Sequence, residues 1–318
     1  MTAAEGAPPG SGSDDVWTVL RMMRWSGDYL DEKGVSRGRL DAEHLLAHAL
    51  GLERLQLYLQ YDRPLTRGEL DRYRPLLKRR ARREPLQYIL GRAAFRELDL
   101  EVDPRVLIPR PETEVLVQEI LDWTGDLEAR GLEAVDVGTG SGAIALSLAM
   151  EGPFHHVVAT DASREALEVA GHNAAEAGVE DRVELRHGSL FEPLGPEERF
   201  DVVVSNPPYV AEGEAAELEP EVVDWEPTGA LFAGPDGLAV LRALVSGAGR
   251  HLKGGGLLAL ELGAGQAGPM VTAVEEAGGW DDVRVRKDLA GRERVLLARR
   301  AAGTGAEDED TTFENETR

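Results

Sequence analysis

Between residues 14 and 84, apolar side chains recur three or four positions apart, which is the spacing of one face of a helix. Thr66 and Glu69 have the S/T-x-x-E spacing of a capping box, in which each side chain accepts a hydrogen bond from a free backbone N–H. Residues 14–84 are therefore predicted to form a small helical bundle. The periodic positions are clearest in two runs: Leu45, Leu46, Ala49 and Leu50 before Gly51, and Leu70, Tyr73 and Leu77.

The period shortens between residues 85 and 106. Two strand-like groups stand on either side of Gly91: Tyr88 and Ile89, then Phe95, Leu98, Leu100 and Val102. Two short strands separated by a glycine are typical of a β-hairpin. We predict that residues 85–106 form a hairpin that links two domains.

From residue 107 to residue 300, short apolar runs alternate with helical stretches, which predicts an α/β fold with a mainly parallel sheet. The last two runs are joined by a short turn around Gly291. Because that turn is too short for a helical crossover, these two strands are expected to be antiparallel. The seven predicted strands are Ala134–Val137, His156–Thr160, Val183–Arg186, Phe200–Ser205, Gly256–Glu261, Val283–Arg286 and Arg294–Ala298.

The two ends of the chain lack periodic patterns. Residues 1–13 are rich in Gly, Pro and Ser and are predicted to be a disordered leader, and residues 301–318 are predicted to be a disordered acidic tail. No run approaches the roughly 18 apolar residues of a membrane span, and the leader lacks the basic and apolar regions of a secretory signal. We expect a monomeric cytoplasmic protein that binds no membrane.

Composition narrows the chemistry further. The chain has 58 acidic and 35 basic side chains and a formal net charge of −23, which argues against direct binding of DNA. It has no cysteine, so disulfides and Cys-ligated zinc or iron–sulfur sites are excluded. His44 and His48 have a zinc-compatible spacing, but the glutamate of H-E-x-x-H is missing. A structural role is favoured for both histidines, and no metal site is predicted.

A glycine-rich turn follows the first predicted strand and leads into an apolar helix. Glycines let the backbone turn tightly and approach a ligand closely, although a purely structural turn would also use them. The spacing is G-x-G-x-G rather than G-x-G-x-x-G, which favours a nucleoside cofactor without a pyrophosphate in the loop. The turn consists of Gly138, Thr139, Gly140, Ser141 and Gly142.

Asp161 ends the next predicted strand, 23 residues after Gly138. An acid at this place can accept hydrogen bonds from both ribose hydroxyls of an adenosine. Asp161 could also cap the following helix together with Ser163, and the two roles can coexist. The glycine-rich turn and Asp161 together suggest S-adenosylmethionine, rather than NAD, as the cofactor.

The apolar strand at residues 200–205 ends in Asn206-Pro207-Pro208-Tyr209, at the edge of the sheet where ligands bind in open α/β folds. Two prolines fix the chain there, which a simple strand terminator could also use. The Asn206 carboxamide oxygen can accept one N–H of a planar amide or aromatic amine, and the Pro207 carbonyl can accept the other. Tyr209 can stack on the planar group. Catalysis would then be mainly positioning and local electrostatics.

With these motifs, the chain resembles the HemK-type release-factor glutamine methyltransferases over roughly residues 14–300. The glycine loop and the Asn-Pro-Pro-Tyr turn alone would admit many amino-methyltransferases, including DNA adenine and rRNA guanine enzymes. The discriminating segment is Leu107–Glu114, which reads LIPRPETE; closely similar ribosomal-protein glutamine methyltransferases have Ser where Pro111 stands. Further matches are Leu86–Gly91, Glu226-Pro227 with Ala230-Leu231, Gly234 with Asp236–Leu238, and Asp288–Arg292.

The resemblance implies a seven-stranded, Rossmann-like S-adenosylmethionine-dependent methyltransferase domain at residues 107–300. It implies methyl transfer to the side-chain nitrogen (N5) of the glutamine in the Gly-Gly-Gln motif of class-1 peptide chain release factors. Residues 138–142 would hold the methionine part of the cofactor, and Asp161 would bind the ribose. Asn206, Pro207, Pro208 and Tyr209 would hold the glutamine amide, with Asn206 also beside the cofactor, while the helical region would help to grip the release factor.

One position departs from the family pattern. After the third predicted strand the family often has Gly-Asp or Ser-Asp, with the acid near the adenine amino group. Here Ser189 and Leu190 follow Gly188. Ser189 can accept a hydrogen bond but carries no charge, and Leu190 would pack on the adenine. The departure puts the adenine contact in question rather than the function.

Several alternatives stay open. Amino-methylation of rRNA or DNA bases, or of a ribosomal-protein glutamine, is the main rival, and an inactive cofactor-binding adaptor is another. The acidic excess, with only four lysines among the basic residues, fits a GC-rich genome, adaptation to high salt, or steering of a basic release factor.

Three charged features have structural and functional interpretations. The basic run at residues 78–83 is expected to interact with a helix dipole or with an acidic part of the release factor. Arg110 is expected to form an ion pair that fixes the linker, with a partner that the sequence does not reveal. Glu112 and Glu114 are expected to be acids of a helix start rather than catalysts.

Overall fold

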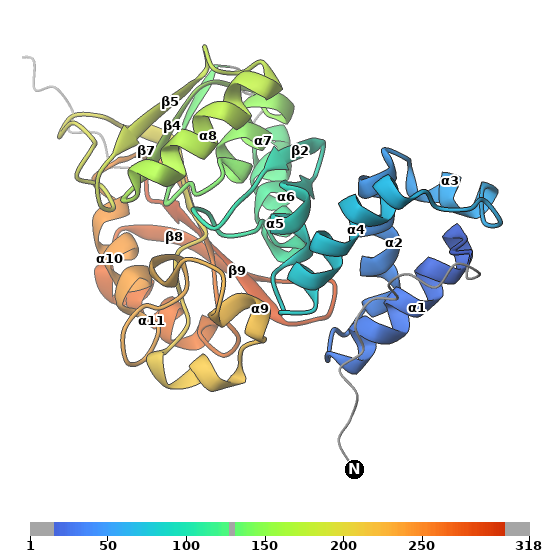
Figure 1. The fold of residues 1–318 in the computed structure, drawn as a ribbon. Coiled ribbons are helices and arrows are strands. Elements are labelled where there is room, and N and C mark those ends of the chain that lie inside the picture. Colours follow the sequence, from blue (N-terminus) through green and yellow to red (C-terminus); the bar gives the residue numbers. More distant parts are fainter. Residues whose placement is uncertain (1–15, 127–130, 303–318) are drawn as a thin grey trace, which may run out of the picture.

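The computed structural model describes residues 16–126 and 131–302 (Figure 1). The predicted disordered leader and most of the predicted acidic tail lie outside these ranges. The N-terminal region is helical and has its own core, which includes Met23, Leu45, Leu57 and Tyr73, as the sequence pattern predicts. Its helices are α1 (Val19–Glu32), α2 (Gly38–Leu50), α3 (Arg54–Leu59), α4 (Arg67–Arg80) and α5 (Leu86–Leu90).

The predicted capping box begins α4. The Glu69 N–H donates to the Thr66 hydroxyl at 3.3 Å, and the Thr66 N–H donates to the Glu69 carboxylate at 2.7 Å. The pair satisfies two of the backbone donors that every helix start leaves open. Pro75 lies inside α4, which nevertheless continues to Arg80.

The linker contains a hairpin, but a shorter one than predicted. Strands β1 (Arg92–Phe95) and β2 (Leu98–Glu101) pair antiparallel through a tight turn. Tyr88 and Ile89, predicted as strand, instead belong to α5, which ends at Gly91 with φ +74°. Both side chains are buried although they are neighbours in sequence. The strand prediction was wrong here: in the helical turn of α5, Tyr88 packs into the core that the hairpin joins, and Ile89 packs into the core of the N-terminal helices.

The C-terminal region is built on one seven-stranded sheet, as predicted. The strand order is β5-β4-β3-β6-β7-β9-β8, and β9 alone runs opposite to the other six strands. The short turn between β8 and β9 makes that pair antiparallel, which confirms the prediction. The strands are β3 (Leu132–Val137), β4 (Phe154–Asp161), β5 (Val183–His187), β6 (Phe200–Ser205), β7 (Leu252–Glu261), β8 (Trp280–Lys287) and β9 (Glu293–Arg300).

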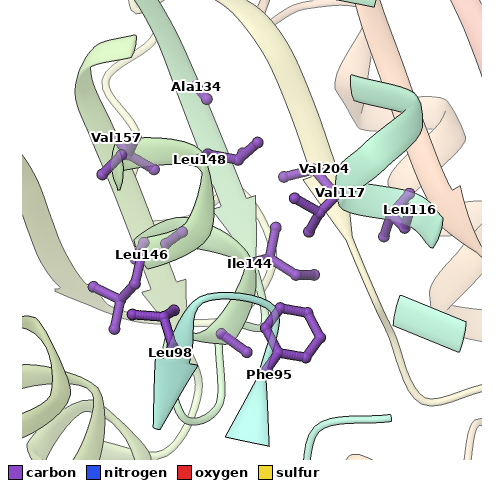
Figure 2. Packing of buried hydrophobic residues seen from close by; sticks show 14 of the residues in the cluster. Phe95, Leu98, Leu116, Val117, Ala134, Ile144, Leu146, Leu148, Val157 and Val204 are labelled. Atoms are coloured by element: carbon purple, nitrogen blue, oxygen red, sulfur yellow. The ribbon is translucent and has the colours of Figure 1, made fainter. Parts of the chain in front are cut away.

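Helices cover both faces of this sheet, so its central strands are apolar on both sides. Helices α6 (Pro111–Asp126), α7 (Ala143–Glu151) and α8 (Arg164–Ala177) pack on one face with Val202 and Val204. Helices α10 (Ala239–Ala248) and α11 (Ala267–Ala277) pack on the other face with Val203. The hairpin joins the first of these cores, where Phe95 and Leu98 lie near α7 (Figure 2).

The strand order reverses beside β3, because β4 and β5 extend the sheet to one side and β6 and β7 extend it to the other. Such a reversal opens a crevice at the carboxyl ends of the strands. A segment of short turns follows β6 and borders that crevice. It contains the 3₁₀ turns Glu212–Glu217 and Thr228–Ala230 and the short helix α9 (Pro220–Val223).

An ion-pair cluster joins this segment to the helical region. The Glu221 carboxylate of α9 accepts hydrogen bonds from Arg80 at 2.8 Å and from Arg83 at 2.7 Å. Arg80 also donates to Asp41 of α2 at 2.7 Å. Burial alone would raise the pKa of Glu221, but the hydrogen bonds from Arg83 and Arg80 outweigh it and hold the pKa below its ordinary value. Arg79 of the same basic run donates to Glu84 at 2.8 Å, so three arginines of this run form ion pairs within the protein.

Replacement of Glu221 tests this connection. Glu221→Gln keeps the shape but leaves the nearly buried Arg80 without one of its two carboxylate partners. We expect the free energy of unfolding to fall by about 2–3 kcal/mol, because breaking a buried ion pair from one side leaves an uncompensated charge. Urea unfolding measures the change. Glu217→Gln, on the exposed part of the same segment, is the control, and an equal, small effect of both substitutions would contradict the prediction.

Candidate active site

A cavity of about 510 Å³ lies at the carboxyl ends of β3, β4 and β6. Ten of the twelve predicted site residues line it, although they come from four separate stretches of the chain. The two that do not are Gly142 and Tyr209. The ten are Gly138, Thr139, Gly140, Ser141, Asp161, Ser189, Leu190, Asn206, Pro207 and Pro208.

The glycine loop needs its glycines for backbone geometry. Gly138, Gly140 and Gly142 have φ values of +79°, +57° and +87°, in the left-handed region that other residues rarely adopt. Among the described residues, no atom would lie within 4 Å of a Cβ built on Gly138 or Gly140. The loop therefore leaves open space beside its backbone. Gly142 instead begins α7, where a Cβ would come within 3.2 Å of Leu146.

Asp161 holds the loop from the end of β4. One of its carboxylate oxygens accepts the Gly140 N–H at 2.9 Å, and the other accepts the Ser163 N–H at 2.8 Å. The Ser163 hydroxyl caps α8 by accepting the Ala166 N–H at 3.1 Å. Ser163 thus does the helix capping, whereas Asp161 braces the loop and faces the cavity. Its binding of a ribose stays a prediction.

Ser189 and Leu190 line the cavity after β5. The Ser189 N–H donates to the Glu192 carboxylate at 3.2 Å, and Leu190 has φ +50°. The turn brings the Leu190 side chain against the core around α10 and keeps it at the cavity. Contact of these two residues with an adenine stays a prediction.

Asn206 follows Ser205, the last residue of β6, and the Ser205 side chain binds the neighbouring strand β3. The Ser205 hydroxyl donates to the Val137 carbonyl oxygen of β3 at 2.6 Å. The Asn206 side-chain NH2 donates to the Thr113 hydroxyl oxygen at 3.0 Å. Tyr209 packs in the core beyond the cavity wall, and its hydroxyl donates to Glu261 at 3.2 Å. Stacking of Tyr209 on a substrate stays a prediction that the cavity lining does not support.

The sequence did not single out three residues that adjoin this site. Thr113 lies in the cavity wall, and its hydroxyl donates to Glu261 at 2.6 Å. Glu261 ends β7 and is buried, and Asp136 near the end of β3 is buried beneath the loop, where it accepts the Thr139 hydroxyl at 2.6 Å. An acid at the end of an apolar strand was the signal that singled out Asp161. The same signal at Glu261 could have been used.

Burial dominates the electrostatics of the two carboxyls. Desolvation raises the pKa of Asp136 to about 7, against the opposing hydrogen bonds from Thr139 and Ala145. Desolvation likewise raises the pKa of Glu261 to about 7, against hydrogen bonds from Thr113 and Tyr209. The carboxyls therefore titrate near neutral pH.

The segment before α6 behaves as its sequence predicts. Arg110 donates to the Glu226 carboxylate at 2.5 Å. Glu226 is therefore the ion-pair partner of Arg110 that the sequence does not reveal. Glu112 and Glu114 stand in the first turn of α6, as acids of a helix start should. The Glu226 pair ties this segment to the turn that supplies Pro227 to the cavity wall.

Within residues 16–126 and 131–302, no group of three or more His, Cys, Asp or Glu side chains is placed to hold a metal ion. No helix in these same ranges has both the length and the apolar character needed to cross a membrane.

A sheet of this strand order with a glycine loop after β3 defines the class of α/β methyltransferases. Among solved structures, the hMettl16 catalytic domain in complex with MAT2A 3'UTR hairpin 1 has a TM-score of 0.52 and 19% identity. The match covers 70% of this chain and 79% of that one. At this identity the likeness shows the fold alone. Residues 21–91 match the PrmC N-terminal domain, and residues 112–223 match the methyltransferase small domain.

The curated relatives narrow the class to one family. The release factor glutamine methyltransferase of Geobacter sulfurreducens is 45% identical over 285 residues, which are 90% of this chain and 98% of that protein. The same enzyme of Rhodopirellula baltica is 41% identical over 291 residues, covering 91% and 98%. That of Mycolicibacterium smegmatis is 44% identical over 272 residues, covering 85% and 93%. The chain belongs to the release factor glutamine methyltransferase family, as its motifs predict.

The raised pKa values predict how stability depends on pH. Between about pH 5 and pH 7 the folded protein keeps protons on Asp136 and Glu261 that the unfolded chain has released. The free energy of unfolding should therefore decrease as the pH rises through this interval, by on the order of 2 kcal/mol for each carboxyl.

Chemical unfolding at a series of pH values measures this slope. Asp136→Asn and Glu261→Gln should each flatten it, because each removes one titrating group. Glu217→Gln is the control and should leave the slope unchanged. A slope that neither buried substitution alters would contradict the assignment of both raised pKa values.

Proposed function

We propose that the protein transfers a methyl group from S-adenosylmethionine to the N5 side-chain nitrogen of the glutamine in the Gly-Gly-Gln motif of class-1 release factors. The product is N5-methylglutamine. The observation that carries the proposal is the meeting of two motifs in one cavity: the glycine loop after β3 and the Asn206 turn after β6. Membership of the release factor glutamine methyltransferase family supports the same substrate class.

The cavity suits the cofactor. Its volume of about 510 Å³ lies within the usual range for small-molecule sites, roughly 300–1,000 Å³. The open space beside Gly138 and Gly140 admits a ligand against the loop backbone. Asp161 stands at the end of β4, where an acid can accept hydrogen bonds from both hydroxyls of a ribose. We assign the methionine part to residues 138–142, the ribose to Asp161, and the adenine to Ser189 and Leu190.

The Asn206 turn suits a primary amide. The Asn206 carboxamide oxygen accepts one N–H of the glutamine side chain, and the Pro207 carbonyl oxygen accepts the other. Pro207 and Pro208 fix the backbone of this turn, so both acceptors are held before the substrate arrives. Such preorganised acceptors favour the nitrogen as it rehybridises and direct its lone pair toward the cofactor.

Bound S-adenosylmethionine would supply an electrophilic methyl group on a sulfonium. The new bond would form between the amide nitrogen and the methyl carbon, and the carbon–sulfur bond would break with its electron pair going to sulfur. The amide nitrogen becomes more acidic as its new bond forms, and it then loses one proton to water. The residues of the chain bind and orient the amide, and no strong base is required before attack.

The helical region supplies the second half of the substrate site in this proposal. It is fastened to the segment around α9 through Glu221, and the same segment contributes Pro227, Gly229 and Ala230 to the cavity wall. A release factor held by the helices would therefore present its glutamine loop to a cavity of fixed position.

Incubation of the purified protein with a class-1 release factor and S-adenosylmethionine tests the proposal. Peptide mass spectrometry should find one added methyl group, a gain of about 14 Da, on the peptide that contains Gly-Gly-Gln. A release factor whose glutamine is replaced by alanine is the control and should gain none. Methyl groups found on rRNA or on a ribosomal protein, with none on the release factor, would refute the proposal.

Substitution of Asn206 tests the assigned acceptor. Asn206→Ala should reduce kcat/KM for the release factor by about 30- to 1,000-fold, which corresponds to roughly 2–4 kcal/mol of transition-state stabilisation. Calorimetry should show that the affinity for S-adenosylmethionine changes far less. Near-full turnover by this variant would remove Asn206 from the mechanism.

A further inference from the structure

We propose that Thr113 and Glu261 are positioning residues, which orient the Asn206 carboxamide so that its oxygen, and not its NH2 group, meets the substrate amide. This inference rests on the proposed function of Asn206. It assigns a use to a buried acid and a hydroxyl that neither motif of the site contains.

The three side chains form one line of hydrogen bonds from three elements. Asn206 follows β6, Thr113 stands in the first turn of α6, and Glu261 ends β7. The Asn206 nitrogen lies 3.0 Å from the Thr113 hydroxyl oxygen, which lies 2.6 Å from a Glu261 carboxylate oxygen. Thr113 is 3% exposed and Glu261 is 1% exposed, so the bond between them is shielded from water, whereas the bond from Asn206 to Thr113 at the cavity wall is partly buried.

The chemistry of the groups fixes the direction of every bond in the line. Above pH 7, where a Glu261 with a pKa of about 7 is largely ionised, its carboxylate only accepts hydrogen bonds, and the threonine hydroxyl has a single proton to donate. Thr113 must therefore give its proton to Glu261, which leaves only lone pairs to face Asn206. The side of the Asn206 amide toward Thr113 must be the NH2 group, and the oxygen is then turned away from Thr113.

Orientation matters because the two ends of a carboxamide have almost the same shape but opposite hydrogen-bonding character. With the NH2 group toward the substrate, a donor would face the N–H groups of the glutamine. With the oxygen toward it, an acceptor faces a donor. The line of bonds selects the second arrangement before any substrate binds, so binding energy is not used to turn the amide.

The outer end of the line is also anchored. The second carboxylate oxygen of Glu261 accepts the Tyr209 hydroxyl at 3.2 Å, so each oxygen has a donor. The Arg294 guanidinium is close enough to favour the charged form, while the Glu112 carboxylate disfavours it. Burial of an acid is costly, and it raises the pKa of Glu261 to about 7 even with these hydrogen bonds. A glutamine in the same space would add an NH2 donor, whereas the ionised acid offers acceptors only.

Three substitutions separate the hydroxyl and the charge from the shape. Thr113→Val keeps the branched shape and removes the hydroxyl, whereas Thr113→Ser keeps the hydroxyl. Glu261→Gln keeps the shape but adds an NH2 donor, which allows the hydrogen bonds to run in the reverse direction. Thermal unfolding and calorimetry with S-adenosylmethionine verify that each variant is folded and binds the cofactor.

For methyl transfer to the release factor, Thr113→Val and Glu261→Gln should each lower kcat by about 10- to 100-fold, with changes of less than about threefold in KM. Thr113→Ser should restore kcat to within about threefold of the original protein. The double variant Thr113→Val with Glu261→Gln should be no slower than the slower single variant, because both act through one line of bonds. Full kcat in Thr113→Val, or equal losses in Thr113→Ser and Thr113→Val, would overturn the inference.

A substrate-free measurement separates this inference from the proposed function. In ¹⁵N NMR spectra, the Asn206 side-chain NH2 signal is identified by its loss in Asn206→Ala. Its protons should exchange slowly with water in the original protein and in Thr113→Ser, and clearly faster in Thr113→Val. Slow exchange without methylation of the release factor would refute the proposed function but support the positioning. Equal exchange in all three proteins would refute the positioning, whatever the substrate.

Discussion

The hydrogen bond from the Ser205 hydroxyl to the Val137 carbonyl joins the carboxyl ends of two neighbouring parallel strands, and the active site depends on it. Val137 is the last residue of β3 and precedes the glycine loop, while Ser205 is the last residue of β6 and precedes Asn206. This 2.6 Å contact continues the β3–β6 pairing beyond Asp136 and Val204, and together they set the distance between the glycine loop and the Asn206 turn. Because the strand order reverses here, both turns open into the same crevice.

The elements around this contact are held by buried polar groups at the edge of an otherwise apolar sheet. Asp136 lies beneath the loop, and Glu261 lies behind the Asn206 turn, and desolvation raises the pKa of both carboxyls. Each costs stability, and each holds a residue that faces the cavity: Thr139 in one case and Thr113 in the other. Rigid placement of the reacting groups is the gain, since methyl transfer to an amide depends on alignment more than on acid–base chemistry.

Local signals in the sequence predicted most of the fold and the ten cavity residues. The glycine loop, the Asn-Pro-Pro-Tyr turn and the Thr66 capping box are each determined by neighbours in the chain. The strand prediction at Tyr88 and Ile89 was wrong because so short an apolar run fits either a strand or a helical turn. Tertiary contacts decide between the two. Thr113 and Glu261 lie 148 residues apart, as Arg80 and Glu221 lie 141 apart, and no local pattern indicates that such pairs meet.

In the proposed reaction, the Asn206 turn holds the glutamine amide with its nitrogen toward the cofactor. A crystal structure of the protein with S-adenosylhomocysteine and a class-1 release factor tests it most directly. We expect the glutamine nitrogen to lie within about 3 Å of both the Asn206 carboxamide oxygen and the Pro207 carbonyl oxygen and to face the sulfur atom. A glutamine bound elsewhere in the cavity, with its nitrogen turned away from the sulfur, would contradict it.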